Sequence, residues 1–259
     1  MTTTGQIIPS LADARQFQVA AARQNLARRR TQLRAGIRLH IGKWLELHTV
    51  WGPFPNPTAV WGMGNDGFPV ILELNDPEAG ALVCISDADQ HALMGAVLLS
   101  AAFLNSPAAV SAYVLTDRPD RWAWAHQVPI LVGVSRPGDD GLQRALDSAY
   151  RETRYLVVLA DGDAAANALP SGLLQEGPSA GLWPLVFCSP QTGLALAARC
   201  SPLRWTAVVG AMHPPDVTPP IAARHPLLSI LSGGDLQPGV WRAYFKKPRR
   251  TVDFTIPHL

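Results

Sequence analysis

Short apolar runs alternate with helical patterns along most of this chain, and that alternation constrains the fold more than any other feature. The strand-like runs are rich in valine, leucine and isoleucine and cover residues 68–74, 81–85, 110–115, 128–134, 155–160, 182–188 and 205–210. Helical patterns cover residues 91–104 and 141–151. Parallel strands that are buried on both faces have this composition, with helices as their connections. The sequence therefore predicts an α/β domain with a mostly parallel sheet and flanking helices.

Composition sets the domain organisation. Of 259 residues, 47% are hydrophobic and 16% are charged, which suits one large buried core with an appended element and excludes disorder as the main state. Pro53, Pro55 and Pro57 are typical of a linker. We therefore expect two parts, a basic helical N-terminal extension over residues 1–57 and the α/β domain over residues 58–259.

The location of the protein follows from two expected absences. The longest uncharged apolar run, residues 92–104, is shorter than the ~18 residues that a membrane-spanning helix needs. The first 13 residues lack the apolar core of a secretory signal. We expect no membrane span and a cytoplasmic protein. Its three cysteines form no C-x-x-C pair, and its seven histidines show no metal-binding spacing, so we predict no metal site.

Positive charge is concentrated near the N-terminus. Residues 14–45 carry a charge of +8 and contain no acid, although the whole chain has a formal charge of only +2. Leu26, Leu33, Ile37 and Ile41 recur at helical spacing, which indicates an amphipathic helix. Its arginines would contact duplex DNA or anionic lipid, or would dock on the acidic remainder of the protein or on a partner subunit. The candidate contact residues are Arg23, Arg28, Arg29, Arg30, Arg34 and Arg38, with Lys246 and Lys247 in a second basic cluster.

Five segments of the α/β region occur in an order that carries a resemblance. WGMGNDGFPV at residues 61–70 suggests a glycine-turn strand pair, and ALVCI at residues 81–85 a strand that feeds a loop and helix. YLVVLAD at residues 155–161 is similar to a Walker B strand, QEGPSAGL at residues 175–182 to a helix-end turn, and GGDL at residues 233–236 to a turn before a closing strand at residues 240–245. Together they resemble the motor domain of FtsK/HerA-type DNA-pumping ATPases. The resemblance implies a RecA-like P-loop fold and assembly into oligomers on DNA.

The residues that such an ATPase needs are missing. A working phosphate loop reads G-x-x-x-x-G-K-[ST], whereas this chain has Ser86, Asp87, Ala88, Asp89, Gln90 and His91 at that turn. Asp87 or Asp89 would cap the helix amides that phosphate otherwise occupies. Asp161 matches the Walker B acid, but Gly162 replaces the catalytic glutamate of the family, and Ser189-Pro190 replaces its Thr-Gln sensor.

The resemblance and these departures together predict a degenerate ATPase. We expect a catalytically inactive structural or regulatory subunit, without a cofactor, that forms a homo-oligomer or a complex with an active FtsK/HerA-like ATPase. Two alternatives remain open: a divergent DNA translocase subunit that binds ATP and magnesium by other contacts, and a DNA-binding module that uses no nucleotide.

Two further patterns suggest other functions. Residues 177–181 satisfy G-x-S-x-G, followed by Asp216 and His225 in the order of an α/β-hydrolase triad, but a helix precedes the motif and a strand follows it, the reverse of a nucleophile elbow. Trp122 and Trp124 stand beside Arg118 and Arg121, a spacing that suits either base stacking or a half-buried surface.

Overall fold

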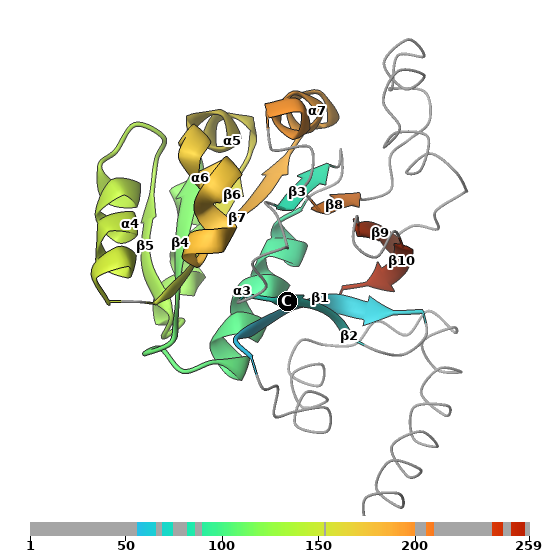
Figure 1. Ribbon diagram of the computed structural model, residues 1–259, viewed down its shortest axis with the longest axis horizontal. Coiled ribbons are helices and arrows are strands. Elements are labelled where there is room, and N and C mark those ends of the chain that lie inside the picture. The colour runs from blue at the N-terminus through green and yellow to red at the C-terminus, as the bar shows by residue number, and fades with distance from the viewer. Residues whose placement is uncertain are drawn as a thin grey trace, which may run out of the picture.

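The computed structural model describes residues 56–65, 69–74, 82–85, 90–152, 154–199, 206–209, 240–245 and 250–256. The predicted basic helix and the 1–57 extension lie outside these residues except for Asn56 and Pro57, so the domain boundary stays a prediction. The described strands form one sheet, and Figure 1 shows their arrangement. The strands are β1 (Thr58–Gly64), β2 (Pro69–Glu73), β3 (Leu82–Ile85), β4 (Val110–Thr116), β5 (Leu131–Ser135), β6 (Tyr155–Asp161), β7 (Leu182–Cys188), β8 (Thr206–Val209), β9 (Val240–Phe245) and β10 (Arg250–Thr255).

The sheet has the order β2-β1-β10-β9-β8-β3-β7-β6-β4-β5. Strands β8, β3, β7, β6, β4 and β5 are parallel to one another. Strands β9, β10, β1 and β2 continue the sheet with antiparallel pairing. The predicted α/β class with a mostly parallel sheet is confirmed, and the glycine-turn strand pair is the β1–β2 hairpin.

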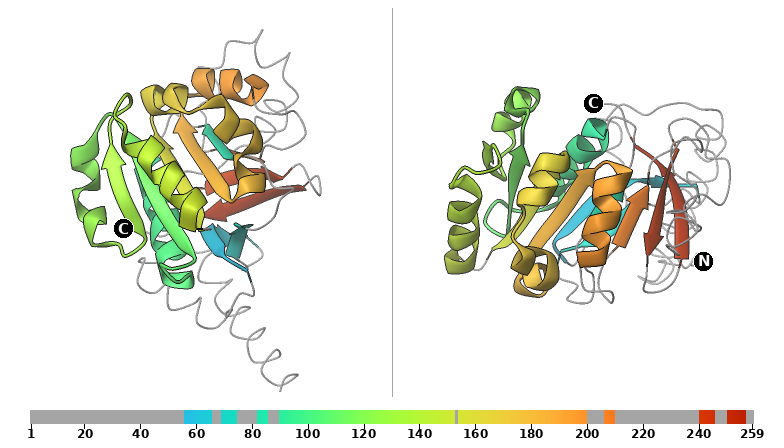
Figure 2. Two further views of the ribbon diagram at one scale, coloured as in Figure 1. Left: turned by 60° about the vertical axis from the view of Figure 1, so that its left-hand side comes forward. Right: turned by 90° about the horizontal axis from the view of Figure 1, so that it is seen from above.

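The helices cover both faces of the parallel strands (Figure 2). One face packs against α3, and the other packs against α4 to α7. The helices are α3 (His91–Leu104), α4 (Gly141–Glu152), α5 (Asp163–Ala168), α6 (Ser171–Glu176) and α7 (Pro190–Arg199), with 3₁₀ segments η1 (Pro119–Gln127) and η2 (Gly177–Ala180).

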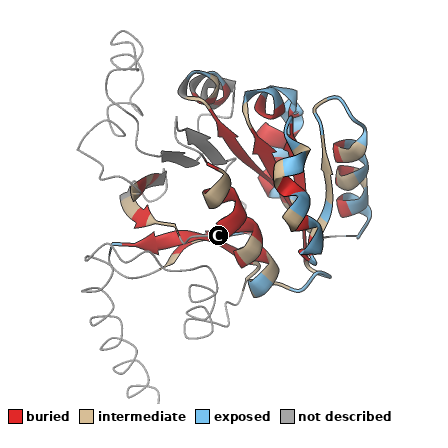
Figure 3. Ribbon diagram, turned by 180° about the vertical axis from the view of Figure 1, so that it is seen from behind, coloured by how far each residue is buried: buried red, intermediate tan, exposed pale blue. Residues whose placement is uncertain are grey.

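Helix α3 is apolar around most of its circumference because it is enclosed on two sides. The parallel strands cover one side, and β1 crosses the other, where the Ser100 hydroxyl donates to Val60 O (3.0 Å) and accepts from Val60 N (2.9 Å). Asn105 makes a second such pair with the backbone of Thr58. Figure 3 shows the resulting contrast: β1, β4, β6, β7 and most of α3 are buried, while the outer faces of α4 and α6 are exposed. The helix predicted over residues 91–104 is confirmed to the residue.

The strand predicted over residues 128–134 is displaced. Strand β5 begins at Leu131, whose N–H donates to Val128 O in a turn that follows η1. Pro129 has no N–H to give to a sheet ladder, so this part of the apolar run forms a turn and not a strand.

Candidate functional site

The ends of β4 and β6 bring two polar side chains to the same face of the sheet. In β6, Val157 and Leu159 belong to the core on the α3 side, and Leu156 and Val158 to the core on the other side. Because side chains alternate along a strand, Asp161 faces α3. Thr116 ends β4 and lies opposite Asp161 in the parallel pairing, with the same orientation. The predicted Walker B acid is therefore directed at the beginning of α3, where a P-loop helix would hold phosphate.

The Asp161 carboxylate is held by donors of the chain itself. Its Oδ2 accepts hydrogen bonds from the Thr116 hydroxyl (2.9 Å) and from the Trp122 indole Nε1 (3.0 Å). Its Oδ1 lies 3.7 Å from Nη2 of Arg118. The Asp161 side chain is only 7% exposed, whereas that of Arg118 is 55% exposed and lies at the surface of the site. A buried carboxylate with these partners has its charge compensated without a metal ion.

An aromatic cluster joins η1 to the first residue of α3. The fully buried Trp122 ring meets His91 edge-on, with centroids 4.8 Å apart at 75°, and stacks on Trp124 at 5.9 Å and 24°. Trp124 Nε1 donates to His91 Nε2 at 3.4 Å. The amide of Gln90, the residue before α3, donates through Nε2 to Cys188 O at 3.0 Å. Gln90 and His91, predicted near the lost lysine and hydroxyl residues, thus bind the end of β7 and the two indoles.

Gly162 has a backbone conformation that other residues rarely adopt. Its φ is +98° and its ψ is 169°, and its N–H donates to Phe187 O at 2.8 Å. This region of φ/ψ space is accessible almost only to glycine. The backbone conformation at residue 162 therefore disfavours a glutamate, the residue that the family resemblance leads us to expect there.

The segments after β6 and β7 bind each other. Asp163 Oδ1 accepts from the backbone N–H of Ser189, and its Oδ2 accepts from the Ser189 hydroxyl, both at 2.8 Å. Ser189 O in turn accepts from Gly193 N at 2.9 Å, in the first turn of α7, which begins at Pro190. The structure thus brings the segment predicted to replace the sensor, Ser189-Pro190, and the segment predicted to correspond to Walker B together, through a cap between two helix starts.

Cys188 points to the opposite face, away from Asp161. It belongs to the core beneath α5 to α7. Burial, with a smaller contribution from the charge of Asp163, raises the pKa of the Cys188 thiol to about 12. The thiol is therefore protonated at neutral pH and is an apolar core group.

Several predicted site residues fall outside the described residues. Among them are most of the degenerate phosphate turn, the arginine stripe, the second basic cluster and the rest of the suggested hydrolase triad. They are Ser86, Asp87, Ala88, Asp89, Arg23, Arg28, Arg29, Arg30, Arg34, Arg38, Lys246, Lys247, Asp216 and His225.

The G-x-S-x-G motif does not form a nucleophile elbow. Ser179 lies in η2, after α6 and before β7, and its hydroxyl donates to Glu176 O at 2.7 Å. A nucleophile elbow follows the end of a strand, whereas Ser179 precedes the start of one. Trp122 is likewise no base-stacking surface, since it is fully buried.

The sequence analysis missed three partners of Asp161: Thr116, Arg118 and Trp122. Trp122 is 39 residues from Asp161, and no local pattern links the two. Thr116 could have been found, because it directly follows the strand predicted over residues 110–115, which the structure pairs with β6.

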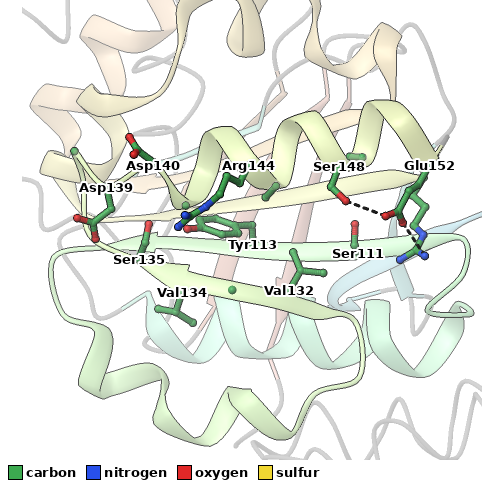
Figure 4. Close-up of a pocket in the computed structure, with 16 residues that line it drawn as sticks. Ser111, Tyr113, Val132, Val134, Ser135, Asp139, Asp140, Arg144, Ser148 and Glu152 are labelled. Carbon is green, nitrogen blue, oxygen red and sulfur yellow. Dashed lines mark hydrogen bonds and ion pairs between the residues drawn. The ribbon is translucent and has the colours of Figure 1, made fainter.

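An open groove of about 800 Å³ runs along the outer edge of the sheet, between β5 and α4. In Figure 4, Arg144 extends over Tyr113 at one end, and Ser148 and Glu152 lie at the other, where Glu152 forms an ion pair with Arg154 (2.7 Å). The groove shares no residue with the Asp161 site. Within the described ranges, no group of three histidine, cysteine, aspartate or glutamate side chains is placed to hold a metal ion, and no helix is long and apolar enough to cross a membrane.

Comparison with known proteins places the fold. No protein-family model and no curated protein matches the sequence. Solved structures do match. The cytoplasmic domain of EssC is 12% identical with a TM-score of 0.58, and EssC (ATPases 2 and 3) from Geobacillus thermodenitrificans is 13% identical with a TM-score of 0.59. The conjugation coupling protein TcpA of pCW3, with ATPγS, is 10% identical with a TM-score of 0.55.

These matches cover most of this chain but only part of the others. The two EssC structures each cover 85% of the chain, which spans 47% and 44% of them, and TcpA covers 78% of the chain, which spans 66% of TcpA. At this identity the likeness establishes the fold alone. The chain has the P-loop fold of FtsK/HerA-type ATPase domains, as the resemblance predicted.

Proposed function

We propose that this chain is a pseudo-ATPase, a P-loop domain that does not hydrolyse ATP and serves as a structural or regulatory subunit. The proposal rests on the Asp161 carboxylate, which is buried and already bound by side chains of the chain itself. In P-loop NTPases the Walker B acid helps to hold the magnesium ion that neutralises charge on the β- and γ-phosphates. Here the same carboxylate accepts hydrogen bonds from Trp122 and Thr116 and faces Arg118.

Two more contacts support the same conclusion. Any residue with a side chain at position 162 would have to adopt a φ of +98°. A glutamate that orients the attacking water could therefore not be placed there unless the turn changed its conformation. At the sensor position, Ser189 is engaged by Asp163. With no lysine in the phosphate turn, a bound triphosphate would meet Asp87 and Asp89 without a compensating charge.

The partner that fits this role is a domain of the same fold. EssC is described as a chain with ATPases 2 and 3, so domains of this fold occur together in one protein. We propose that the chain assembles with copies of itself or with an active FtsK/HerA-like ATPase in the cytoplasm.

Nucleotide binding and turnover by the purified chain test the proposal. Titration calorimetry with ATPγS and Mg²⁺ should give no heat of binding, and the ATP turnover rate should equal that of the Asp161→Ala variant prepared in parallel. Turnover that this substitution abolishes would overturn the proposal. Tight ATPγS binding without turnover would instead favour a divergent nucleotide-binding subunit.

The arginine-rich segment supports a contact with duplex DNA as a second candidate function, because residues 14–45 carry +8 and no acid. Such binding should weaken steeply with salt and should weaken further when Arg28, Arg29 and Arg30 are all changed to glutamine. A gel-shift titration at two salt concentrations measures both effects. Absence of binding at low salt eliminates this candidate and leaves the pseudo-ATPase proposal unchanged.

A further inference from the structure

The Walker B acid of this chain does not fit a divalent cation, and the structure identifies what replaces it. We propose that the Trp122 indole takes the place of the metal ion, so that the chain closes its own cation position whether or not nucleotide is present. This inference rests on the proposed function, which it deepens: it names the residue that keeps the site closed.

The indole joins the two points that magnesium joins in a working site. There the ion lies between the hydroxyl at the start of the P-loop helix and the Walker B acid. Here Nε1 of Trp122 donates to Asp161 Oδ2 at 3.0 Å, and the ring of the same side chain contacts His91, the first residue of α3, at 4.8 Å between centroids. The indole N–H thus takes the place of the bond between the metal ion and the Walker B acid, and the indole ring takes the place of the bond between the ion and the hydroxyl.

Groups of the chain itself already bind most of the oxygen atoms that a magnesium ion would need here. Mg²⁺ needs near-octahedral oxygen ligands at about 2.0–2.1 Å. Asp161 Oδ2 already has two donors at hydrogen-bond distance, and both donor side chains come from buried residues, Thr116 and Trp122. The next carboxylate along the chain, Asp163, holds Ser189. A cation could reach Asp161 Oδ2 only by displacing an indole that is 0% exposed, and at Oδ1 it would meet the Arg118 guanidinium, which lies 3.7 Å away.

The consequence concerns regulation. In a nucleotide-driven domain, the contact between the Walker B strand and the P-loop helix changes as the ion and phosphates bind and leave. In this chain Trp122 maintains that contact permanently. The spacing between β6 and α3 should therefore be independent of nucleotide and cation, as suits a subunit that supports an assembly without a cycle of its own.

Removing the indole N–H tests the inference directly. Trp122→Phe keeps a ring beside His91 and Trp124 but leaves the Nε1 position open next to Asp161, and Trp122→Ala opens the whole position. Trp124→Phe is the matched control, because it removes an indole from the same cluster whose N–H donates to His91 and not to Asp161. Thermal unfolding of the full chain is measured with and without Mn²⁺ or Mg²⁺, in the absence of nucleotide.

The wild type and Trp124→Phe should show no change in melting temperature with the metal. Trp122→Phe, or Trp122→Ala if that variant folds, should gain a metal-dependent rise of roughly 3–6 °C at about ten times the dissociation constant. Adding Asp161→Asn to the variant should abolish the rise.

Two results would overturn the inference. One is an equal metal response in the wild type, which would mean that the cation position is open. The other is a folded Trp122→Phe variant without any response, which would mean that the indole occupies some other place. Neither result requires ATP hydrolysis, so the proposed lack of turnover stands or fails separately.

Discussion

Two carboxylates at the end of strand β6 have opposite surroundings, one buried and one exposed. Asp161 is the last residue of β6, is 5% exposed, and accepts hydrogen bonds from buried groups on the α3 side. Asp163 is the first residue of α5, is exposed, and binds Ser189 on the other side of the sheet ends. A single glycine, Gly162, separates them and reverses the direction of the chain.

Under the proposed function, the difference explains how a nucleotide site could be lost while its acids remain. Asp161 accepts hydrogen bonds from the buried Thr116 hydroxyl and Trp122 indole, so its removal would leave buried donors unsatisfied. Asp163 serves a local cap that water could replace. The acidic residues at the end of β6 therefore resemble a Walker B motif in the sequence, although Asp161 binds buried side chains and Asp163 forms a cap.

The largest expected effect concerns Cys188, which lies on the Asp163 side of the sheet. With a pKa of about 12, its thiolate fraction at pH 8 is about a thousandfold below that of a thiol with the ordinary value near 9. Alkylation mapped to Cys188 by mass spectrometry should be slower in the folded than in the urea-unfolded chain by at least this factor. Asp163→Ala should leave most of the protection, because burial is the larger cause; a fully reactive Cys188 in that variant would contradict this ranking.

The same pKa shift has a definite sign for stability. A group whose pKa is raised on folding binds its proton more tightly in the folded chain, so its contribution is complete below the unfolded value near 9. The contribution is lost as the pH rises from about 9 towards 12. Urea unfolding at a series of pH values should show a decline over that window that is absent in Cys188→Ala.

Among the substitutions at the end of β6, Asp161→Ala should lower the free energy of unfolding the most. It leaves the Thr116 hydroxyl and the Trp122 indole N–H without an acceptor, at a cost of about 3 kcal/mol in the free energy of unfolding. Asp163→Ala is the matched control and should cost about 0.5 kcal/mol, because its partners are exposed. Equal costs in urea unfolding would mean that burial does not distinguish the two acids.

Gly162→Ala should be the next most destabilising change. A Cβ there meets only Asp117 Oδ1 at 3.8 Å, an ordinary contact, so the cost comes from the backbone at φ +98° and should be about 2 kcal/mol. Gly172→Ala is the control: it lies within α6, has nothing within 4 Å, and should be neutral or stabilising by up to about 1 kcal/mol. A neutral Gly162→Ala would mean that the turn between the two carboxylates can relax.

Much of this fold could be predicted because long apolar runs determine it. Strand β7 and helix α3 occur at the predicted residues, since each is a continuous apolar segment with a clear beginning and end. Strand β10 was not predicted: its sequence RTVDFT alternates polar and apolar residues, and its pairing with β9 depends on contacts such as Arg242 with Asp253. Antiparallel pairing of this kind has a weak local signal.

The site could be predicted only in outline. The absence of the lysine and of the glutamate is visible in the sequence, and so is the acid at Asp161. The partner of that acid is not, because Trp122 reaches it through the fold, from a 3₁₀ segment after β4. The side chain that occupies the site of the proposed pseudo-ATPase reaches it through a tertiary contact. The missing lysine and glutamate belong to local motifs, so their absence can be recognised in the sequence.

The smallest expected effect is the coupling between Asp163 and Ser189. Their side-chain and backbone contacts are both 2.8 Å, but they are exposed, so each single alanine substitution should cost only about 0.5 kcal/mol. A double-mutant cycle in urea unfolding should give a coupling of about 0.3 kcal/mol, smaller than the cost of Asp163→Ala, since the hydroxyl bond is lost in either single variant while the backbone N–H bond is lost only with Asp163. The matched cycle of Asp161 with Ser189 should give no coupling, because the two side chains lie on opposite sides of the sheet ends. Coupling of Ser189 to Asp161 would instead mean that the two carboxylates still act as one site.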